Sequence, residues 1–185
     1  MVRSDARENR DRILAVARHA LDISGEVSLN QIAHDAGVGP GTLYRHFPNR
    51  EALVIAVYRQ EIEDLVDATP QLVGDLTPIE ALRKWTRELV RHMRIKHGLG
   101  DALSPSAAQA VGEESYGPVI RAITTILDAG KADGSIREDA DPADFLFLTG
   151  ALWRAGDAND DRPERMLSLI LDGLRAGQGT RRVIR

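Results

Sequence analysis

Residues 28–50 of the chain are SLNQIAHDAGVGPGTLYRHFPNR, and this stretch decides the fold of the N-terminal part. Ser28 is placed to cap a helix, because its hydroxyl can accept from the backbone N–H three residues on, while Gln31 can reach back to the Ser28 N–H. Gly37 predicts the end of that helix, since glycine adopts the left-handed conformation without a clash. Pro40 predicts the start of a second helix. Proline lacks a backbone N–H, and the N–H of the first helical residue makes no hydrogen bond within the helix.

The two predicted helices have an apolar face and a polar face. Helices this short cannot bury a core alone, so the outward polar face must be the reason for the arrangement. A helix, a four-residue turn and a polar second helix form the helix-turn-helix pattern, whose second helix enters a DNA major groove. An ordinary helical hairpin remains the alternative on pattern alone. The predicted inward residues are Ile32, Ala33, Ala36, Leu43 and Phe47.

The residues themselves add a resemblance. The run GTLYRHFPNREAL (41–53), preceded by Ile32-Ala33 and Ala36-Gly37-Val38, resembles the DNA-binding domain of the tetracycline-repressor (TetR) family of bacterial transcriptional regulators. The resemblance extends from about Ile13 to Val57, and beyond that it is only architectural. It implies a repressor that binds a palindromic operator in double-stranded DNA as a homodimer and leaves it when a small-molecule effector binds. A ligand- or protein-binding module that has lost operator binding is the alternative.

The resemblance also implies which residues touch DNA. Thr42, Tyr44 and His46 match positions that usually touch phosphates, as do Ser28 and Arg50. Arg45 could bond the O6 and N7 of guanine together, with a phosphate clamp as the alternative. Pro40 and Gly41 have no side-chain hydrogen-bond donor. They therefore suggest that the DNA sequence is recognised through apolar contact with thymine methyl groups and through DNA shape. The predicted DNA-binding residues are Ser28, Asn30, Pro40, Gly41, Thr42, Tyr44, Arg45, His46 and Arg50.

The charge of the chain is unevenly distributed. The net charge is -4, which by itself argues against a nucleic-acid partner. Residues 1–60, however, carry eight arginines against seven acidic residues, so the excess of acid lies in the remainder. Local positive charge, rather than the total, sets phosphate attraction. Arg3, Arg7, Arg10 and Arg12 stand at the start, although a solvated tail with neighbouring acids would look the same.

Composition limits the class of protein. With 43% hydrophobic and 28% charged residues, the 185-residue chain is typical of a soluble globular protein. The absence of cysteine excludes disulfides and thiolate metal sites. No apolar run approaches the roughly 20 residues that cross a membrane, and the charged N-terminus does not look like a signal peptide. We therefore expect a cytoplasmic protein without a membrane partner.

Helical periodicity continues along the whole chain, and no strand pattern survives. A polar arm (1–9) precedes a first helix that ends before Gly25, and a fourth helix follows Asn49 to about Ala68. Residues 69–77 are a predicted boundary, and later helices begin at Pro78, near Pro105, and at Pro118, Pro142 and Pro163. The prediction is an all-α fold of about nine helices. It comprises a three-helix helix-turn-helix head (1–57) and a helical ligand-binding and dimerisation bundle (58–185).

Two further sites are predicted in the bundle. Pockets are mostly apolar with few polar groups, and ordinary core packing is the alternative for each residue. The predicted pocket residues are Trp85, Leu89, His92, Met93, Leu103, Tyr116, Ile120, Phe145 and Leu148. The last two helices carry apolar residues on more than one face, which suggests a four-helix dimer contact, with deep burial in one chain as the alternative. The predicted interface residues are Leu152, Trp153, Met166, Leu167, Ile170, Leu171 and Leu174.

Catalytic motifs are missing. Gly37, Gly39 and Gly41 do not have the spacing of a phosphate-binding loop, and neither HExxH nor GxSxG occurs. His92 and His97 are five residues apart, a poor helical spacing for a shared metal. We therefore expect no enzyme, metal or cofactor.

Overall fold

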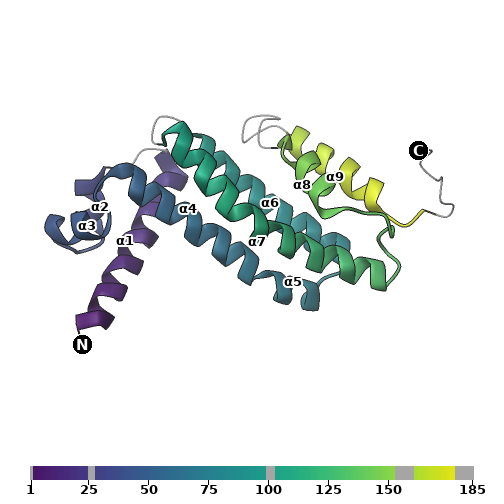
Figure 1. Cartoon of the computed structure of the whole chain (residues 1–185), viewed down its shortest axis with the longest axis horizontal. Coiled ribbons are helices and arrows are strands. Elements are labelled where there is room, and N and C mark those ends of the chain that lie inside the picture. The colour runs from purple at the N-terminus through teal and green to yellow at the C-terminus, as the bar shows by residue number, and fades with distance from the viewer. Residues whose placement is uncertain (1, 25–27, 99–102, 153–160, 178–185) are drawn as a thin grey trace. The chain divides into compact units, whose positions relative to one another are not determined.

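The computed structural model describes residues 2–24, 28–98, 103–152 and 161–177, and in these ranges the predicted all-α fold is confirmed (Figure 1). The sole sheet-like pairing among them is an isolated bridge between Ile136 and Arg175. No helix in the described part is long and apolar enough to cross a membrane. The helices are α1 (Val2–Ser24), α2 (Leu29–Asp35), α3 (Pro40–His46), α4 (Arg50–Asp67), α5 (Thr69–Asp75), α6 (Pro78–Gly98), α7 (Pro105–Ala132), α8 (Pro142–Thr149) and α9 (Arg162–Leu174).

The chain divides into two compact units. The head unit consists of Met1–Glu63 and His92–Ser115, and the body unit consists of Asp64–Arg91 and Tyr116–Arg185. The first division lies close to the boundary predicted at residue 57. The head unit additionally takes in the end of α6 and the start of α7, because these segments return to it from far along the sequence.

The core of the head unit joins one stripe of α1 to the inward faces of α2 and α3 and to the first turns of α4. Burying a large aliphatic or aromatic side chain contributes about 1.5 to 3 kcal/mol. This contribution offsets the poor intrinsic stability of two seven-residue helices. The large buried residues are Ile13, Leu14, Leu21, Ile32, Leu43, Phe47, Leu53, Val54 and Val57.

A buried carboxylate also lies in the head unit. Glu61 of α4 is 1% exposed. Arg18 Nε, on α1, lies 3.1 Å from Glu61 Oε1, and His92 Nδ1, on α6, lies 2.9 Å from Glu61 Oε2. These are ion-pair distances, but the Glu61 oxygens and His92 Nδ1 do not have hydrogen-bond angles, and the Arg18 side chain keeps 38% exposure. Glu61 therefore links three helices through charge with incomplete hydrogen bonding.

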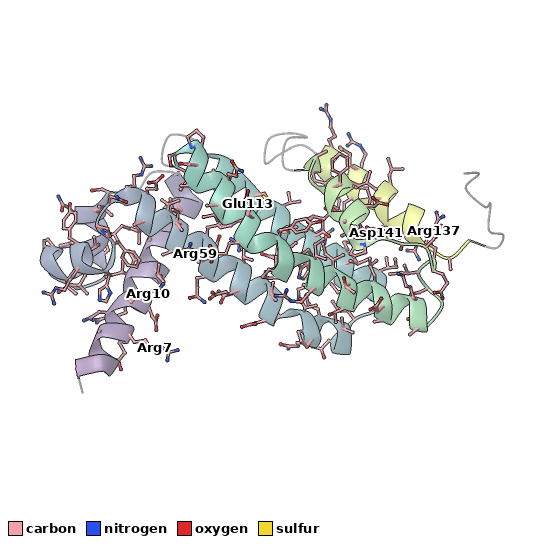
Figure 2. The ribbon with its side chains drawn as sticks, viewed as in Figure 1. Arg7, Arg10, Arg59, Glu113, Arg137 and Asp141 are labelled. Carbon is pink, nitrogen blue, oxygen red and sulfur yellow. The ribbon has the colours of Figure 1, made fainter. Side chains whose placement is uncertain are left out.

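The start of α7 is held against α4. The backbone N–H and the hydroxyl of Ser104 both donate to Glu51 Oε1 at 2.8 Å. Both bonds lower the pKa of the Glu51 carboxyl group, and the bond from the Ser104 backbone N–H has the larger effect. Arg59 of α4, labelled in Figure 2, donates through Nη2 to Glu114 Oε2 of α7 at 2.7 Å. The first half of α7 is thus part of the support of the head.

The body unit has a core centred on α6. Trp85 is fully buried, and its Nε1–H donates to Thr69 Oγ1 of α5 at 3.2 Å. The guanidinium groups of Arg83 and Arg87 on α6 both bind Glu164 of α9. The hydrogen bond from Arg87 is the main cause of the lowered pKa of Glu164. These contacts fix α5 and α9 to the same helix.

Three boundaries differ from the sequence expectation. α1 begins at Val2 instead of following a polar arm to residue 9. Residues 69–75 form a helix, because Pro70 stands in a first turn, where proline starts a helix. α7 runs unbroken through Pro118. The residue before it is Gly117, which lacks the Cβ that would clash with a proline ring, so the helix continues.

We predict that Glu61→Ala lowers the free energy of unfolding by about 1 to 3 kcal/mol, because it removes the buried carboxyl group that Arg18 and His92 face at ion-pair distance and leaves a cavity in its place. The measurement is urea unfolding followed by circular dichroism. Glu63→Ala is the matched control, since Glu63 lies on the same helix but is exposed. Its effect should stay within about 0.5 kcal/mol. Equal effects of the two substitutions would contradict a structural role for the buried carboxylate.

Candidate nucleic-acid interface

The turn between α2 and α3 sets the direction of α3. Gly37 has a φ of +65°, in the left-handed region, as predicted. The Val38 N–H donates to the Ala33 carbonyl at 2.9 Å, which closes the end of α2. Gly39 then caps α3, and Pro40 stands in its first turn. The helix-turn-helix predicted from these glycines and this proline is therefore present.

The caps of the flanking helices follow the sequence in part. The Ser28 hydroxyl accepts from the Gln31 N–H at 3.5 Å, so it caps α2 weakly. The Gln31 side chain donates to Asp35 Oδ1 at 2.7 Å and is not bonded to the Ser28 N–H, so the expected second half of the capping box was wrong. Asn49 Oδ1 accepts from the Ala52 N–H at 2.8 Å, which confirms the predicted cap of α4.

The inward and outward faces of α3 are clearly different. Leu43 is completely buried, and Phe47, which caps the helix, is 3% exposed. Pro40, Gly41 and Arg45 are exposed, and Tyr44 keeps 45% of its surface. Thr42 and His46 are half-buried at the edges of this face. The face offers hydroxyl, imidazole and guanidinium groups around an inert tip.

Flanking segments add further polar groups. Ser28 and Asn30, at the start of α2, are exposed. Arg50, in the first turn of α4, is half-buried, and its Nε is enclosed without a hydrogen-bond partner among the described residues. A buried unpaired donor is costly, so an acceptor supplied from outside would stabilise it.

Negative charge is absent from the middle of this surface. The sequence has no acidic residue between Asp35 and Glu51. Asp35 accepts from His34 and Gln31, and these bonds lower its pKa. Glu51 is occupied by Ser104. Arg45, on the exposed face of α3, therefore lies in a segment of 15 residues without an acid, which suits a polyanion.

One contact near α3 was not singled out from the sequence. The guanidinium carbon of Arg10, on α1, lies 6.0 Å from the centroid of the Phe47 ring, a cation–π distance. The signal that could have indicated it is the helical spacing of Arg10 with Leu14, Ala17 and Leu21, which continue one stripe into the head core.

The residues predicted to line one pocket are divided between the two units. His92, Met93 and Leu103 belong to the head unit, where Leu103 packs on the head core. His92 pairs with Glu61. In the body unit Trp85, Leu89 and Phe145 are buried and Ile120 is half-buried, but Tyr116 and Leu148 are 53% and 54% exposed. Leu148 was predicted as an apolar residue of the pocket and Tyr116 as one of its polar groups, yet each lies on a solvent-facing side of its helix.

The residues predicted at the dimer interface also separate into two groups. Leu152, Leu167 and Leu171 are buried within the single chain, whereas Met166, Ile170 and Leu174 are half-buried, and Trp153 lies outside the described residues. The most exposed large apolar side chains of α8 and α9 are Phe147, at 84%, and Leu169, at 74%. The predicted interface set contained neither Phe147 nor Leu169, although both are apolar residues on a second face of these helices.

Known proteins share this architecture. Residues 25–57 match the family of bacterial regulatory proteins of the tetR type, and residues 77–176 match the C-terminal domain of SbtR-like transcriptional regulators. An HTH-type transcriptional regulator of Staphylococcus aureus, strain USA300, is 37% identical over 76 residues. This match spans 40% of the chain and 41% of that relative, so it is confined to part of each protein.

Solved structures extend the similarity over almost the whole chain. The TetR transcriptional regulator SCO0520 of Streptomyces coelicolor is 41% identical, with a TM-score of 0.76 over 90% of this chain and 98% of that one. A TetR transcription regulatory protein of Mycobacterium vanbaalenii is 33% identical, with a TM-score of 0.73 over 95% of this chain and 99% of that one. The N-terminal head and the C-terminal bundle both match TetR-type proteins, and each of these two structures covers at least 90% of the chain. The chain therefore belongs to the TetR family of bacterial regulatory proteins.

Proposed function

We propose that the chain is a cytoplasmic, sequence-specific DNA-binding transcriptional regulator. It acts as a repressor and binds a palindromic operator as a homodimer. The observation that carries this proposal is the exposed face of α3, with Tyr44 and Arg45 outward, Leu43 buried beneath and no acidic residue in the sequence between Asp35 and Glu51. The proposal includes no catalytic step, metal or cofactor.

The proposed contacts divide by chemistry. Thr42, Tyr44 and His46 lie at the exposed face and edges of α3, where hydroxyl and imidazole groups suit phosphate oxygens. Arg50 brings a guanidinium Nε whose acceptor is missing within the described chain. Arg45 is the long exposed donor of α3 and is assigned to a guanine edge. The tip, Pro40-Gly41, contributes close approach and shape rather than hydrogen bonds.

The proposed dimer contact is an apolar surface on α8 and α9, which lie side by side in Figure 1. Phe147 and Leu148 of α8 and Leu169 of α9 are exposed large apolar residues. A cluster of this kind is typical of a protein interface. Phe145 of α8, and Leu167 and Leu171 of α9, occupy the inward faces, so the two helices have apolar residues on both sides, as a four-helix contact requires.

The proposed effector site lies in the body unit. Thr86 of α6 is fully buried, and its hydroxyl has no hydrogen-bond partner among the described residues. Its neighbour Trp85 is part of the buried apolar core. A buried hydroxyl without a partner is costly, and a small molecule with a polar group would satisfy it. An apolar ligand with one or two hydrogen-bonding groups fits this chemistry.

The proposed coupling runs along α6. This helix contributes Thr86 to the body unit and His92 to the head unit, where His92 meets Glu61. A ligand that prefers one position of α6 would therefore bias the head through the Glu61 contacts. A preference of about 1 to 3 kcal/mol changes DNA affinity roughly 5- to 150-fold.

We predict that selection from random double-stranded DNA returns a palindromic consensus. Its half-sites should lie about 34 Å apart or a multiple of this, because two copies of α3 occupy major grooves on one side of the helix. Affinity should fall steeply with salt. Binding that is equally tight to every sequence would contradict a specific regulator and would favour a module without operator recognition.

We predict that Arg45→Ala costs about 1 to 3 kcal/mol of operator affinity for each half-site and relaxes selectivity at one base pair in each of the two half-sites. The measurement is a titration against operators altered one position at a time. Lys84→Ala is the control, since Lys84 is an exposed cation of the body unit. A loss that is uniform at every operator position would assign Arg45 to the phosphate backbone instead.

We predict that the double substitution Phe147→Glu and Leu169→Glu shifts the protein from dimer to monomer while the helix content measured by circular dichroism stays unchanged. Both side chains are exposed in the single chain, so their loss leaves its core intact. Sedimentation equilibrium provides the measurement. Tyr116→Glu, at a half-exposed site on α7, is the matched control and should remain dimeric. A double variant that dimerises like the parent would place the interface elsewhere.

A further inference from the structure

α1 carries one stripe with two different chemistries. At 3.6 residues per turn, positions 7, 10, 14, 17 and 21 fall within roughly 80° of the helix surface. The C-terminal part of this stripe, Leu14, Ala17 and Leu21, is buried in the head core. Its N-terminal continuation is Arg10 and Arg7. The side of α1 that faces the core thus becomes basic where the helix extends past the apolar residues.

The structure shows what the first of these arginines faces. The Arg10 guanidinium stands over the ring of Phe47, with 6.0 Å from its central carbon to the ring centroid. Phe47 is the C-cap of α3 and directly follows His46. The basic part of the stripe therefore begins beside the end of the helix proposed to enter the groove. Figure 2 labels Arg10 and, farther along α1 toward its N-terminus, Arg7.

Neither guanidinium is neutralised within the described part of the chain. Arg7 is exposed and Arg10 half-buried, and no ion pair joins either of them to a described carboxylate. Glu8 and Asp11, in the same turns, are exposed and also unpaired with them. Arg12, which lies on the other side of the helix, instead hydrogen-bonds Asn9. The stripe thus carries two arginines whose positive charges are not paired with a described carboxylate, at the end of the helix face that enters the head core.

We propose that the Arg7–Arg10 stripe is a second DNA-binding surface, which grips the sugar–phosphate backbone flanking the base pairs contacted by α3. The inference rests on the proposed operator binding and extends it to another element. Arginine suits phosphate because its planar fork can donate two hydrogen bonds to one phosphate group. The contact carries no base information, so it adds affinity and fixes the register of the head on the duplex.

The test is Arg7→Ala in the full-length protein, titrated against the selected operator over a range of salt concentrations. Arg7 is chosen because it is exposed and makes no contact with Phe47, so its loss leaves the head core intact. Each lost phosphate contact should reduce the slope of log K against log salt by about 1. Because the proposed homodimer carries two copies of Arg7, the substitution removes two contacts. At a slope of about 0.9 per phosphate, affinity near 0.15 M salt should fall about 5-fold for each contact, or roughly 30-fold in all. The loss should be equal for operators with different flanking sequences.

Two variants control the interpretation. Arg7→Lys keeps the charge and should retain most of the affinity and salt slope. Arg12→Ala removes an arginine from the same helix, off the stripe, and should behave like the parent. An Arg7→Ala protein with unchanged affinity and slope overturns the inference, as does a loss that depends on the flanking base sequence. A parent protein that binds no operator would instead remove the proposed function itself.

Discussion

The burial of Leu43 and Phe47 is the interaction on which the rest of the head depends. α2 and α3 have seven residues each, which is too short for either to be stable in water. Their conformation persists because Ile32, Leu43 and Phe47 enter a core shared with α1 and α4. The polar side chains of α3 face outward because its apolar side chains are buried in this core.

The same core explains why the head includes later parts of the chain. Glu51 and Arg59 of α4 bind Ser104 and Glu114, which hold the first half of α7. Glu61 does the same for the end of α6 through His92. A buried carboxylate is costly to desolvate, so its contacts favour one arrangement of α1, α4 and α6 over alternatives. This is the physical basis for expecting that a change in α6 is felt by the head.

Electrostatics of the chain are local rather than global. The net charge of -4 would repel DNA if it were spread evenly. Instead, the segment from Gly37 to Arg50 has no acid, Asp35 is occupied by its own neighbours, and Glu51 is occupied by Ser104. Arg45 of α3 therefore lies in a stretch of the chain where no acid stands next to it, although the chain as a whole is acidic.

The sequence by itself determined the local elements. Gly37, Pro40 and Asn49 act on backbone groups within a few residues of themselves, so their effects could be predicted without knowledge of the fold. Helical periodicity predicted the all-α class. The positions of the apolar, inward-facing residues of α3 also predicted which of its polar residues face outward. Tyr44 and Arg45 are exposed, and their contacts with DNA are proposed.

The tertiary structure decided which faces meet. Periodicity marked Leu148 as apolar but could not show that its side of α8 faces solvent. It could not show that His92 meets Glu61 rather than a pocket, because their pairing joins residues far apart in sequence. Nor could it show that α7 continues through Pro118, since Gly117 relieves the clash only in the folded helix. Long-range packing selects among local possibilities, and that selection is not encoded within a few residues.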